Sequence, residues 1–499
     1  MRNAKNKNRL LKTNVCLLIM SVSACSVGPD FKKPEIVAPS SFTRDEQIGL
    51  NTNQQTGGIN TKWWRVYGSE EINQLVELAL KHNPNIESSI ANLQVAQENV
   101  RAQQGFFFPQ IGANYAVTRQ SSGPFYQPAI NQTSPTDNSK TNYSSNVNPI
   151  YTIQNTGFTV GYLPDIWGGN RRLVEGLKAN ANAQNYQFIA LQTTIANNVV
   201  ASAMNEALLR EQLKAVQELS FISKKIMDHA VRLNQQGYSS SVDLAYAQSI
   251  YAQAISQVPM IEKAREQNLN LLASLCGKFP SEKMLAPSVL NIQLPASLPT
   301  AIPSNFVKQR PDIQIAEENV RIANSQIGVA IANMLPQISI TATAGSAGQF
   351  FKDLQDSGNM LWSLAGGVNQ PIFQGGSLFA RKRAAEAGLV VAAAQYKSAV
   401  INAFQNVADT LYAINADGKF YTTAAQNENA TRVIYELSTK QLEKGYISEP
   451  VLLQTQVTYL QARINALQAY GTYLGDTASL YQALGGGWTS AQEAFILNK

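Results

Sequence analysis

The chain of 499 residues carries the same pattern twice, and this duplication constrains its fold more than any other feature. Pro84-Asn-Ile86 corresponds to Pro311-Asp-Ile313, and Pro109-Gln-Ile111 corresponds to Pro336-Gln-Ile338, both at an offset of 227 residues. Further on, Gly237-Tyr238 corresponds to Gly445-Tyr446 at an offset of 208, so the first copy holds a loop about twenty residues longer. A duplication that keeps its order over this length predicts one architecture built twice.

The amino terminus has the pattern of a secretory leader. Five basic residues precede a short apolar run at 15–20, and small residues then lead to Cys25. That run is too short to span a bilayer, so residues 1–24 are predicted to be a cleaved signal peptide. The small residues before Cys25 resemble a bacterial lipobox, which implies a covalent N-acyl diacylglycerol on Cys25. An ordinary leader with a cysteine nearby is the alternative. Ser26, in place of aspartate, favours the outer membrane by resemblance to lipoprotein sorting.

Composition excludes several classes of function. The net charge of +6 includes five basic residues of the leader, so the mature chain is close to +1 and nothing favours a nucleic-acid partner. Cys276 is the one cysteine left beside Cys16 of the leader and Cys25, which excludes an intrachain disulfide. His82 and His229 have no metal-ligand spacing, and no phosphate loop is present. We therefore expect no enzyme, metal or other cofactor.

Composition and periodicity also set the predicted boundaries. Residues 25–62 are rich in Pro, Ser, Asn, Gly and Thr, which suits a lipidated tether. The first repeat is placed at 63–277 and the second at 301–487. A linker at 278–300 separates the repeats, and a tail at 488–499 follows them.

Four segments have the two-residue period of strands. Residues 110–118 and 337–344 follow the helix-ending prolines, and return strands are predicted at 157–162 and 362–368. Their length and alternation fit transmembrane β-strands, although a hairpin in a soluble sheet is the alternative. The polar segment 120–155 fits an extracellular loop. Four strands cannot close a barrel, and an open edge in lipid is costly, so several chains must pool their strands. Three chains give twelve strands and two give eight; we favour three.

Long helices without breakers follow each pair of strands. Residues 170–236 contain no proline and form a predicted helix on the order of 100 Å long, which returns at 242–276. The second copy repeats this at 377–444 and 450–484. Faces rich in Ala, Ser and Gln indicate the wall of a water-filled helical tube. A soluble antiparallel bundle is the alternative.

Several motifs resemble the TolC-like outer-membrane efflux factors, and more closely their lipidated OprM/NodT type. Beside the lipobox, they are Arg310-Pro-Asp-Ile313, Leu335-Pro-Gln-Ile-Ser339, Pro371-Ile-Phe-Gln-Gly-Gly-Ser377, Phe404-Gln-Asn-Val-Ala-Asp409 and Ala483-Leu-Gly-Gly-Gly-Trp488. The resemblance implies an α+β membrane protein: a homotrimer with a twelve-stranded transmembrane barrel, four strands per chain, continuous with a long periplasmic α-helical barrel. It implies a passive channel for drug or small-molecule export that docks to a periplasmic adaptor and to an inner-membrane pump of the resistance-nodulation-division type. An exit duct for type I protein secretion and a non-channel structural lipoprotein are the alternatives.

The resemblance also assigns two functional zones. The helix turns are expected to contact the adaptor through Gly237, Tyr238 and Ser240 in the first copy and Gly445, Tyr446 and Ser448 in the second. Asp243 and Gln454 are candidates for the periplasmic gate, where the family often places carboxylates. Gln454 cannot ionise, which puts a complete acidic ring in doubt. Asp243 has a second interpretation, as a carboxylate that caps its own helix.

Overall fold

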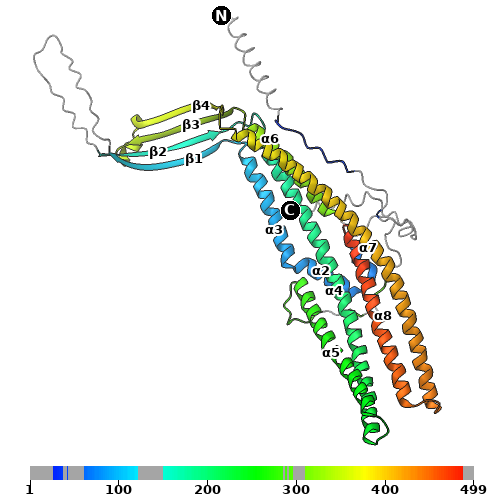
Figure 1. Cartoon of the computed structure of the whole chain (residues 1–499). Helices are drawn as coiled ribbons and strands as arrows, with labels where there is room; N and C mark the ends of the chain where they lie inside the picture. The colour runs from blue at the N-terminus through cyan, green and yellow to red at the C-terminus, as the bar shows by residue number, and fades with distance from the viewer. Residues whose placement is uncertain are drawn as a thin grey trace, which may run out of the picture. The chain divides into compact units, whose positions relative to one another are not determined.

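The computed structural model describes residues 26–36, 42, 61–121, 150–284, 287–288, 292–295 and 310–486. The chain divides into two compact units (Figure 1). The first, here called the sheet unit, comprises Met1–Phe31, Glu98–Leu177 and Ile322–Gly388. The second, here called the helical unit, comprises Lys32–Gln97, Lys178–Arg321 and Leu389–Lys499. Both repeats contribute to both units, as expected of a duplicated chain.

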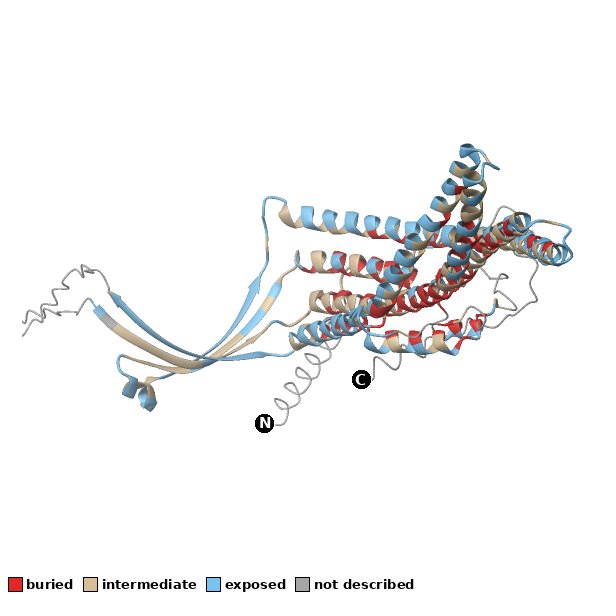
Figure 2. Ribbon diagram, turned by 90° about the horizontal axis from the view of Figure 1, so that it is seen from below, coloured by how far each residue is buried: buried red, intermediate tan, exposed pale blue. Residues whose placement is uncertain are grey.

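The sheet unit contains one antiparallel sheet of four strands in the order β1-β2-β3-β4 (Figure 1). The strands are β1 (Gln110–Ser121), β2 (Ile150–Tyr162), β3 (Gln337–Gly348) and β4 (Met360–Asn369). Each repeat supplies one hairpin, and β2 pairs with β3 to join the two repeats, with Tyr162 opposite Ile340. Most side chains of β1 and β4 are exposed (Figure 2). The four predicted strands are therefore confirmed.

The strand boundaries differ from the prediction in the first repeat. β2 begins at Ile150 and β1 ends at Ser121, so part of the predicted loop 120–155 belongs to the hairpin. The start of β2 was hidden because Gln154 and Asn155 interrupt the alternation of apolar and polar residues. Residues 122–149 lie outside the described part of the chain. In the second repeat two short 3₁₀ turns, η4 (Phe351–Gln355) and η5 (Ser357–Asn359), connect β3 to β4.

The helices repeat as closely as the strands. Proline begins both α3 (Pro84–Gly105) and α6 (Pro311–Ala332), because the first helical position needs no amide hydrogen. α4 (Gly169–Gln235) and α7 (Ser377–Glu443) each have 67 residues, and α5 (Ser241–Leu275) and α8 (Glu449–Ala483) each have 35. The predicted long helical hairpins are confirmed. Among the described residues, no helix combines the length and the apolar character that crossing a bilayer requires.

The helical unit has a core around η1 (Trp63–Tyr67) and α2 (Glu70–His82). The Trp63 ring stacks on the Tyr481 ring of α8, with centroids 5.1 Å apart and planes inclined by 11°. The Tyr67 hydroxyl lies 3.0 Å from the Thr477 hydroxyl, also on α8. A second cluster, which includes Val216, Leu219, Ala254, Leu460 and Ile464, packs α4 against α5 and α8. These contacts hold the long helices in a defined register, which positions the turns at their ends.

Candidate functional site: the two helix turns

The turns between the long helices close in the same way in both repeats. Gly237 has a φ of 80° and Gly445 a φ of 72°, a left-handed conformation that favours glycine. The amide of Tyr238 donates to the Leu233 carbonyl at 2.8 Å, and the amide of Tyr446 donates to the Gln441 carbonyl at 2.9 Å. This is the 6→1 bond that ends a helix at a glycine. The Gly-Tyr pairs found in the sequence are thus helix-ending signals.

The two turns lie at the same end of the helical unit (Figure 1), and each presents a tyrosine to solvent. The side chains of Tyr238 and Tyr446 are 78% and 76% exposed, and Val242 beside the first turn is 77% exposed. Tyrosine is enriched where proteins contact partners, because a rigid ring and a hydroxyl act together. The predicted adaptor-contact residues therefore share one exposed end.

Asp243 and Ser240 form a capping box at the start of α5. The Asp243 amide donates to Ser240 Oγ at 3.1 Å, while the Asp243 carboxylate accepts from the Ser240 amide at 3.1 Å and from its hydroxyl at 2.7 Å. These hydrogen bonds hold the pKa of Asp243 below its usual value. The capping role that was the alternative interpretation of Asp243 is thus present in the geometry.

The second turn is built differently. Ser448 is the N-cap of α8 but makes no side-chain cap hydrogen bond, and Pro450 lies in the first turn of the helix. Gln454 is exposed one turn further along, and its backbone carbonyl accepts a hydrogen bond from the Thr458 hydroxyl at 3.0 Å. Gln454 therefore does not occupy the position that matches Asp243. Sequence reasoning overlooked Glu449, an exposed acid in the first turn of α8, although an acid at a helix start is a recognisable signal.

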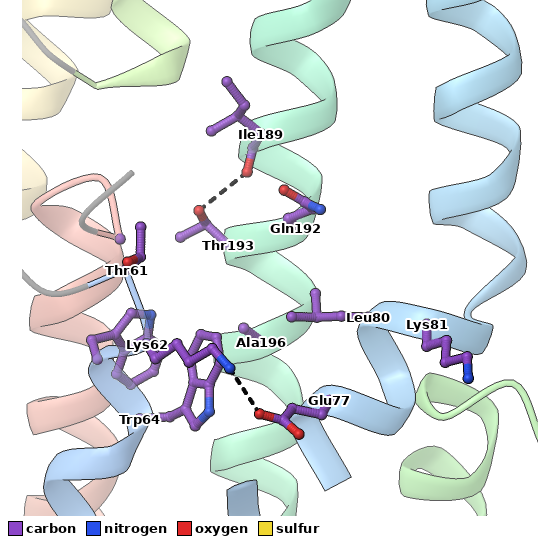
Figure 3. Close-up of a pocket in the computed structure, with 12 residues that line it drawn as sticks. Thr61, Lys62, Trp64, Glu77, Leu80, Lys81, Ile189, Gln192, Thr193 and Ala196 are labelled. Atoms are coloured by element: carbon purple, nitrogen blue, oxygen red, sulfur yellow. Dashed lines mark hydrogen bonds and ion pairs between the residues drawn. The ribbon is translucent and has the colours of Figure 1, made fainter. Parts of the chain in front are cut away.

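A cavity of about 380 Å³ lies within the helical unit, between η1, α2 and α4 (Figure 3). Its wall includes Trp64, Gln192 and Thr193, and an ion pair between Lys62 and Glu77 at 3.0 Å crosses its edge. The Lys62 ammonium lowers the pKa of the Glu77 carboxyl, with a smaller effect from Arg65. No nucleophile with a neighbouring base is among the residues that line this cavity.

The remaining reactive residue type, cysteine, has a structural role where the structure describes it. The Cys276 thiol is buried in the core, 3.7 Å from the Leu75 carbonyl oxygen, and burial raises its pKa to about 11. At neutral pH this thiol is protonated and inert, as expected of a small core residue. Within the described ranges, no group of three or more His, Cys, Asp or Glu side chains could hold a metal ion. Cys25 lies outside the described residues.

The model of the outer membrane efflux protein family matches residues 75–278 and 302–486, which is most of the chain. The chain belongs to this family. The family predicted from the sequence motifs is therefore confirmed, and the protein is an outer-membrane component of efflux.

Curated relatives of this outer membrane efflux protein match over nearly their whole length. The probable efflux pump outer membrane protein TtgC of Pseudomonas putida is 26% identical over 491 residues, covering 95% of this chain and 96% of the relative. The pyoverdine export outer membrane protein OpmQ of Pseudomonas aeruginosa is 23% identical over 485 residues, covering 96% and 97%. These names describe pump components of the relatives, and they agree with the predicted efflux function.

Solved structures share the fold of this efflux protein. The Campylobacter jejuni CmeC outer membrane channel superposes with a TM-score of 0.81 at 22% identity, covering 94% of this chain and 98% of that one. The outer-membrane channel OprN superposes with a TM-score of 0.78 at 21% identity, covering 93% and 100%. The predicted fold class, an α+β membrane protein with four strands and duplicated long helices per chain, is confirmed.

Proposed function

We propose that three copies of this outer-membrane efflux protein form one passive channel. The observation that carries the proposal is the open sheet, in which β1 and β4 each pair with one strand only. Unpaired backbone groups in hydrocarbon cost several kcal/mol each, so a sheet of this kind must close against other copies. Three four-stranded sheets give a barrel of twelve strands, a size known for outer-membrane barrels.

The side chains of the sheet support this arrangement. Exposed apolar residues lie at alternate positions of the two edge strands: Ile111, Tyr115 and Val117 on β1, and Trp362, Leu364 and Val368 on β4. Strands of 10 to 13 residues are long enough to cross a bilayer at a tilt. The apolar face then meets lipid, and the face with small and polar residues lines the lumen.

The four long helices of each chain extend the conduit into the periplasm. α4, α5, α7 and α8 of three copies give twelve helices around one axis. The helix turns at Tyr238 and Tyr446 then form the periplasmic end, where a periplasmic adaptor and an inner-membrane pump of the resistance-nodulation-division type dock. Asp243 and Gln454 lie near this entrance and remain its gate candidates, with Glu449 as a further acid.

Cys25 anchors the mature chain to the outer membrane through its N-acyl diacylglycerol. The exported compounds are small molecules; this class is supported by curated relatives named for toluene, antibiotic and pyoverdine efflux. These names do not favour the alternative of a protein-secretion duct.

The test is the mass of the assembly in mild detergent. We expect native mass spectrometry of the purified protein to give three chains, and a planar bilayer to show discrete conductance steps. Cysteines introduced at Ile111 of β1 and Val368 of β4, on strands that meet only between copies, are expected to cross-link chains into trimers. A folded monomer that resists cross-linking at every concentration would contradict the closed barrel.

A further inference from the structure

Residues 26–31, at the start of the mature chain, lie against the sheet unit rather than free of it. The Val27 amide donates to the Trp167 carbonyl at 3.0 Å, in the segment between β2 and α4. The Trp167 indole in turn donates to the Pro336 carbonyl at 2.7 Å, directly before β3. The amino-terminal segment is therefore held where β2 of the first repeat has ended and β3 of the second repeat begins. The dark blue trace beside α6 in Figure 1 is this part of the chain.

The side chain of Arg172, in the first turn of α4, holds this segment. It is 6% exposed. Its Nε donates to the Val27 carbonyl at 3.1 Å, and Nη2 donates to the Gly28 carbonyl at 3.2 Å and to the Asp30 carboxylate at 3.0 Å. Nη1 donates to Glu175 at 2.8 Å, one turn along the same helix. A buried guanidinium that loses its partners is strongly destabilising, so the body of the protein is incomplete without residues 27–30.

The opposite side of the segment lies on α6 of the second repeat. Asn324 Nδ2 donates to the Pro29 carbonyl at 2.9 Å. Gly28 has a φ of 96°, and a Cβ placed on it would lie 2.6 Å from Gly328 Cα. The two glycines let the backbones of the segment and α6 approach to contact. Because Arg172 lies on α4 and Asn324 on α6, the segment connects the first repeat to the second.

We propose that residues 26–31 are a strap that fixes the lipid-bearing end of the chain at the ends of β2 and β3, with Arg172 as its main holding residue. Ser26 immediately follows Cys25 in the sequence, and a Cβ placed on Gly168, next to Trp167, would lie 2.7 Å from the Ser26 hydroxyl oxygen. The acyl group thus enters the membrane beside the barrel wall instead of at the end of a free tether. The strap also joins the start of α4 to α6 within the sheet unit, so the anchor and the sheet unit move together.

The part of this inference that concerns the lipid rests on the acylation proposed at Cys25; the strap itself does not. The attachment of the strap can be measured as the rate of proteolytic cleavage after Lys32, which is exposed and directly follows the strap. Lys33 beyond it forms an ion pair with Glu317 of the helical unit. Cleavage at this site requires several residues to detach from the rest of the protein. The cleavage rate therefore reports how often the strap detaches.

The experiment is limited trypsin digestion of the full trimer in mild detergent, followed by intact mass. Gly28→Ala changes the strap alone, adding a Cβ against Gly328 at a strained φ, and leaves every body residue in place. Arg172→Lys keeps the charge but loses the planar fork that contacts three strap groups. Gly388→Ala in α7 is the matched control, because an added Cβ there meets nothing within 4 Å.

We expect both strap variants to be cleaved after Lys32 about tenfold faster than the unaltered protein, and the control to be cleaved at the unaltered rate. Gly28→Ala and control rates that both equal the unaltered rate would overturn the strap. A Cys25→Ser chain carried behind an ordinary cleaved leader separates the two claims. Retained protection without fatty-acid label supports a strap that acts independently of acylation. Loss of protection in that chain would show that the lipid, not Arg172, holds the segment, and would overturn the inference.

Discussion

Replacing Asp476 by asparagine is predicted to remove a pH dependence from the stability of the trimer. Asp476 on α8 shares a hydrogen bond with Asp417 on α7. Burial, this hydrogen bond and the repulsion between the two carboxylates together raise the pKa of Asp476 from 3.8 to about 7. A proton shared between the two acids therefore stabilises the contact of α7 with α8.

The direction of the effect follows from the raised pKa. The folded state keeps the proton that the unfolded chain releases near pH 4, so the contribution is complete below about pH 4 and is lost as pH rises to about 7. The full shift corresponds to about 4 kcal/mol. Because solvent partly reaches Asp476, about 1–2 kcal/mol per chain is a realistic size. A chain of this length unfolds with an entropy of about 1 kcal/mol/K, so the shift in midpoint is about 1–2 °C.

The assay is thermal unfolding of the trimer in detergent, followed by tryptophan fluorescence at pH 5 and pH 8. Between pH 5 and pH 8, we expect the midpoint of thermal unfolding to fall by about 1–2 °C more in the unaltered protein than in Asp476→Asn. Asp409→Asn is the control, because Asp409 is an exposed acid on α7 that accepts a hydrogen bond from Gln405 on its own helix. Equal pH dependence in Asp476→Asn and the unaltered protein would show that the pair does not share a proton.

Three further predictions concern other parts of the chain. Gly277→Ala should lower the free energy of unfolding by about 2 kcal/mol or more, because the φ of Gly277 is 70° and the added Cβ would lie 2.1 Å from the His82 carbonyl oxygen. Gly475→Ala, whose added Cβ meets nothing within 4 Å, should be neutral or stabilising, and urea titrations of both variants test this. Cys25→Ser should abolish metabolic labelling with a fatty acid, and label retained in the variant would refute the lipid site. Asp243→Asn should weaken the block of single-channel currents by periplasmic divalent cations, and Gln454→Asp should strengthen it; an unchanged block in Asp243→Asn would leave the acid as a helix cap only.

The repeated motifs predicted most of the fold because they mark points where backbone geometry changes. Proline at 84 and 311 begins a helix, and the Gly-Tyr pairs at 237 and 445 end one, each for a steric reason that applies wherever it occurs. The start of β2 was missed because membrane strands carry a weaker periodic signal than helices do. Local sequence signals therefore place the ends of helices well and the ends of membrane strands less well.

The strap could not be predicted in the same way. Arg172 meets its strap partners across 142 to 145 residues of chain, and no local pattern records a contact at that distance. Residues 26–36 have the composition of a linker, and the prediction treated them as a tether. Glu449 is different, because an acid in the first turn of a helix is a local signal, whereas the resemblance to the family points to Gln454.

The two hairpins share a backbone but differ in the polar contacts between their helices. At an offset of 208, Glu206 and Arg265 of the first repeat correspond to Ile414 and Tyr473 of the second, and Asn268 corresponds to Asp476. The first hairpin therefore has a buried acid matched by a base, with Glu206 and Arg265 2.9 Å apart. The second has an acid facing an acid.

Duplication conserves the helix lengths and the turns, because those set the dimensions of the tube, while the contacts between helices have diverged. Burial raises the pKa of the Glu206 carboxyl in the first hairpin, and the nearby Arg265 offsets part of that effect. Asp476 instead faces a second acid and loses its shared proton as pH rises to about 7. The packing of α7 against α8 therefore loosens on the alkaline side. Because Asp476 lies near the carboxyl end of α8 and Tyr446 lies just before its start, we expect this loosening at the end of the hairpin opposite the turn.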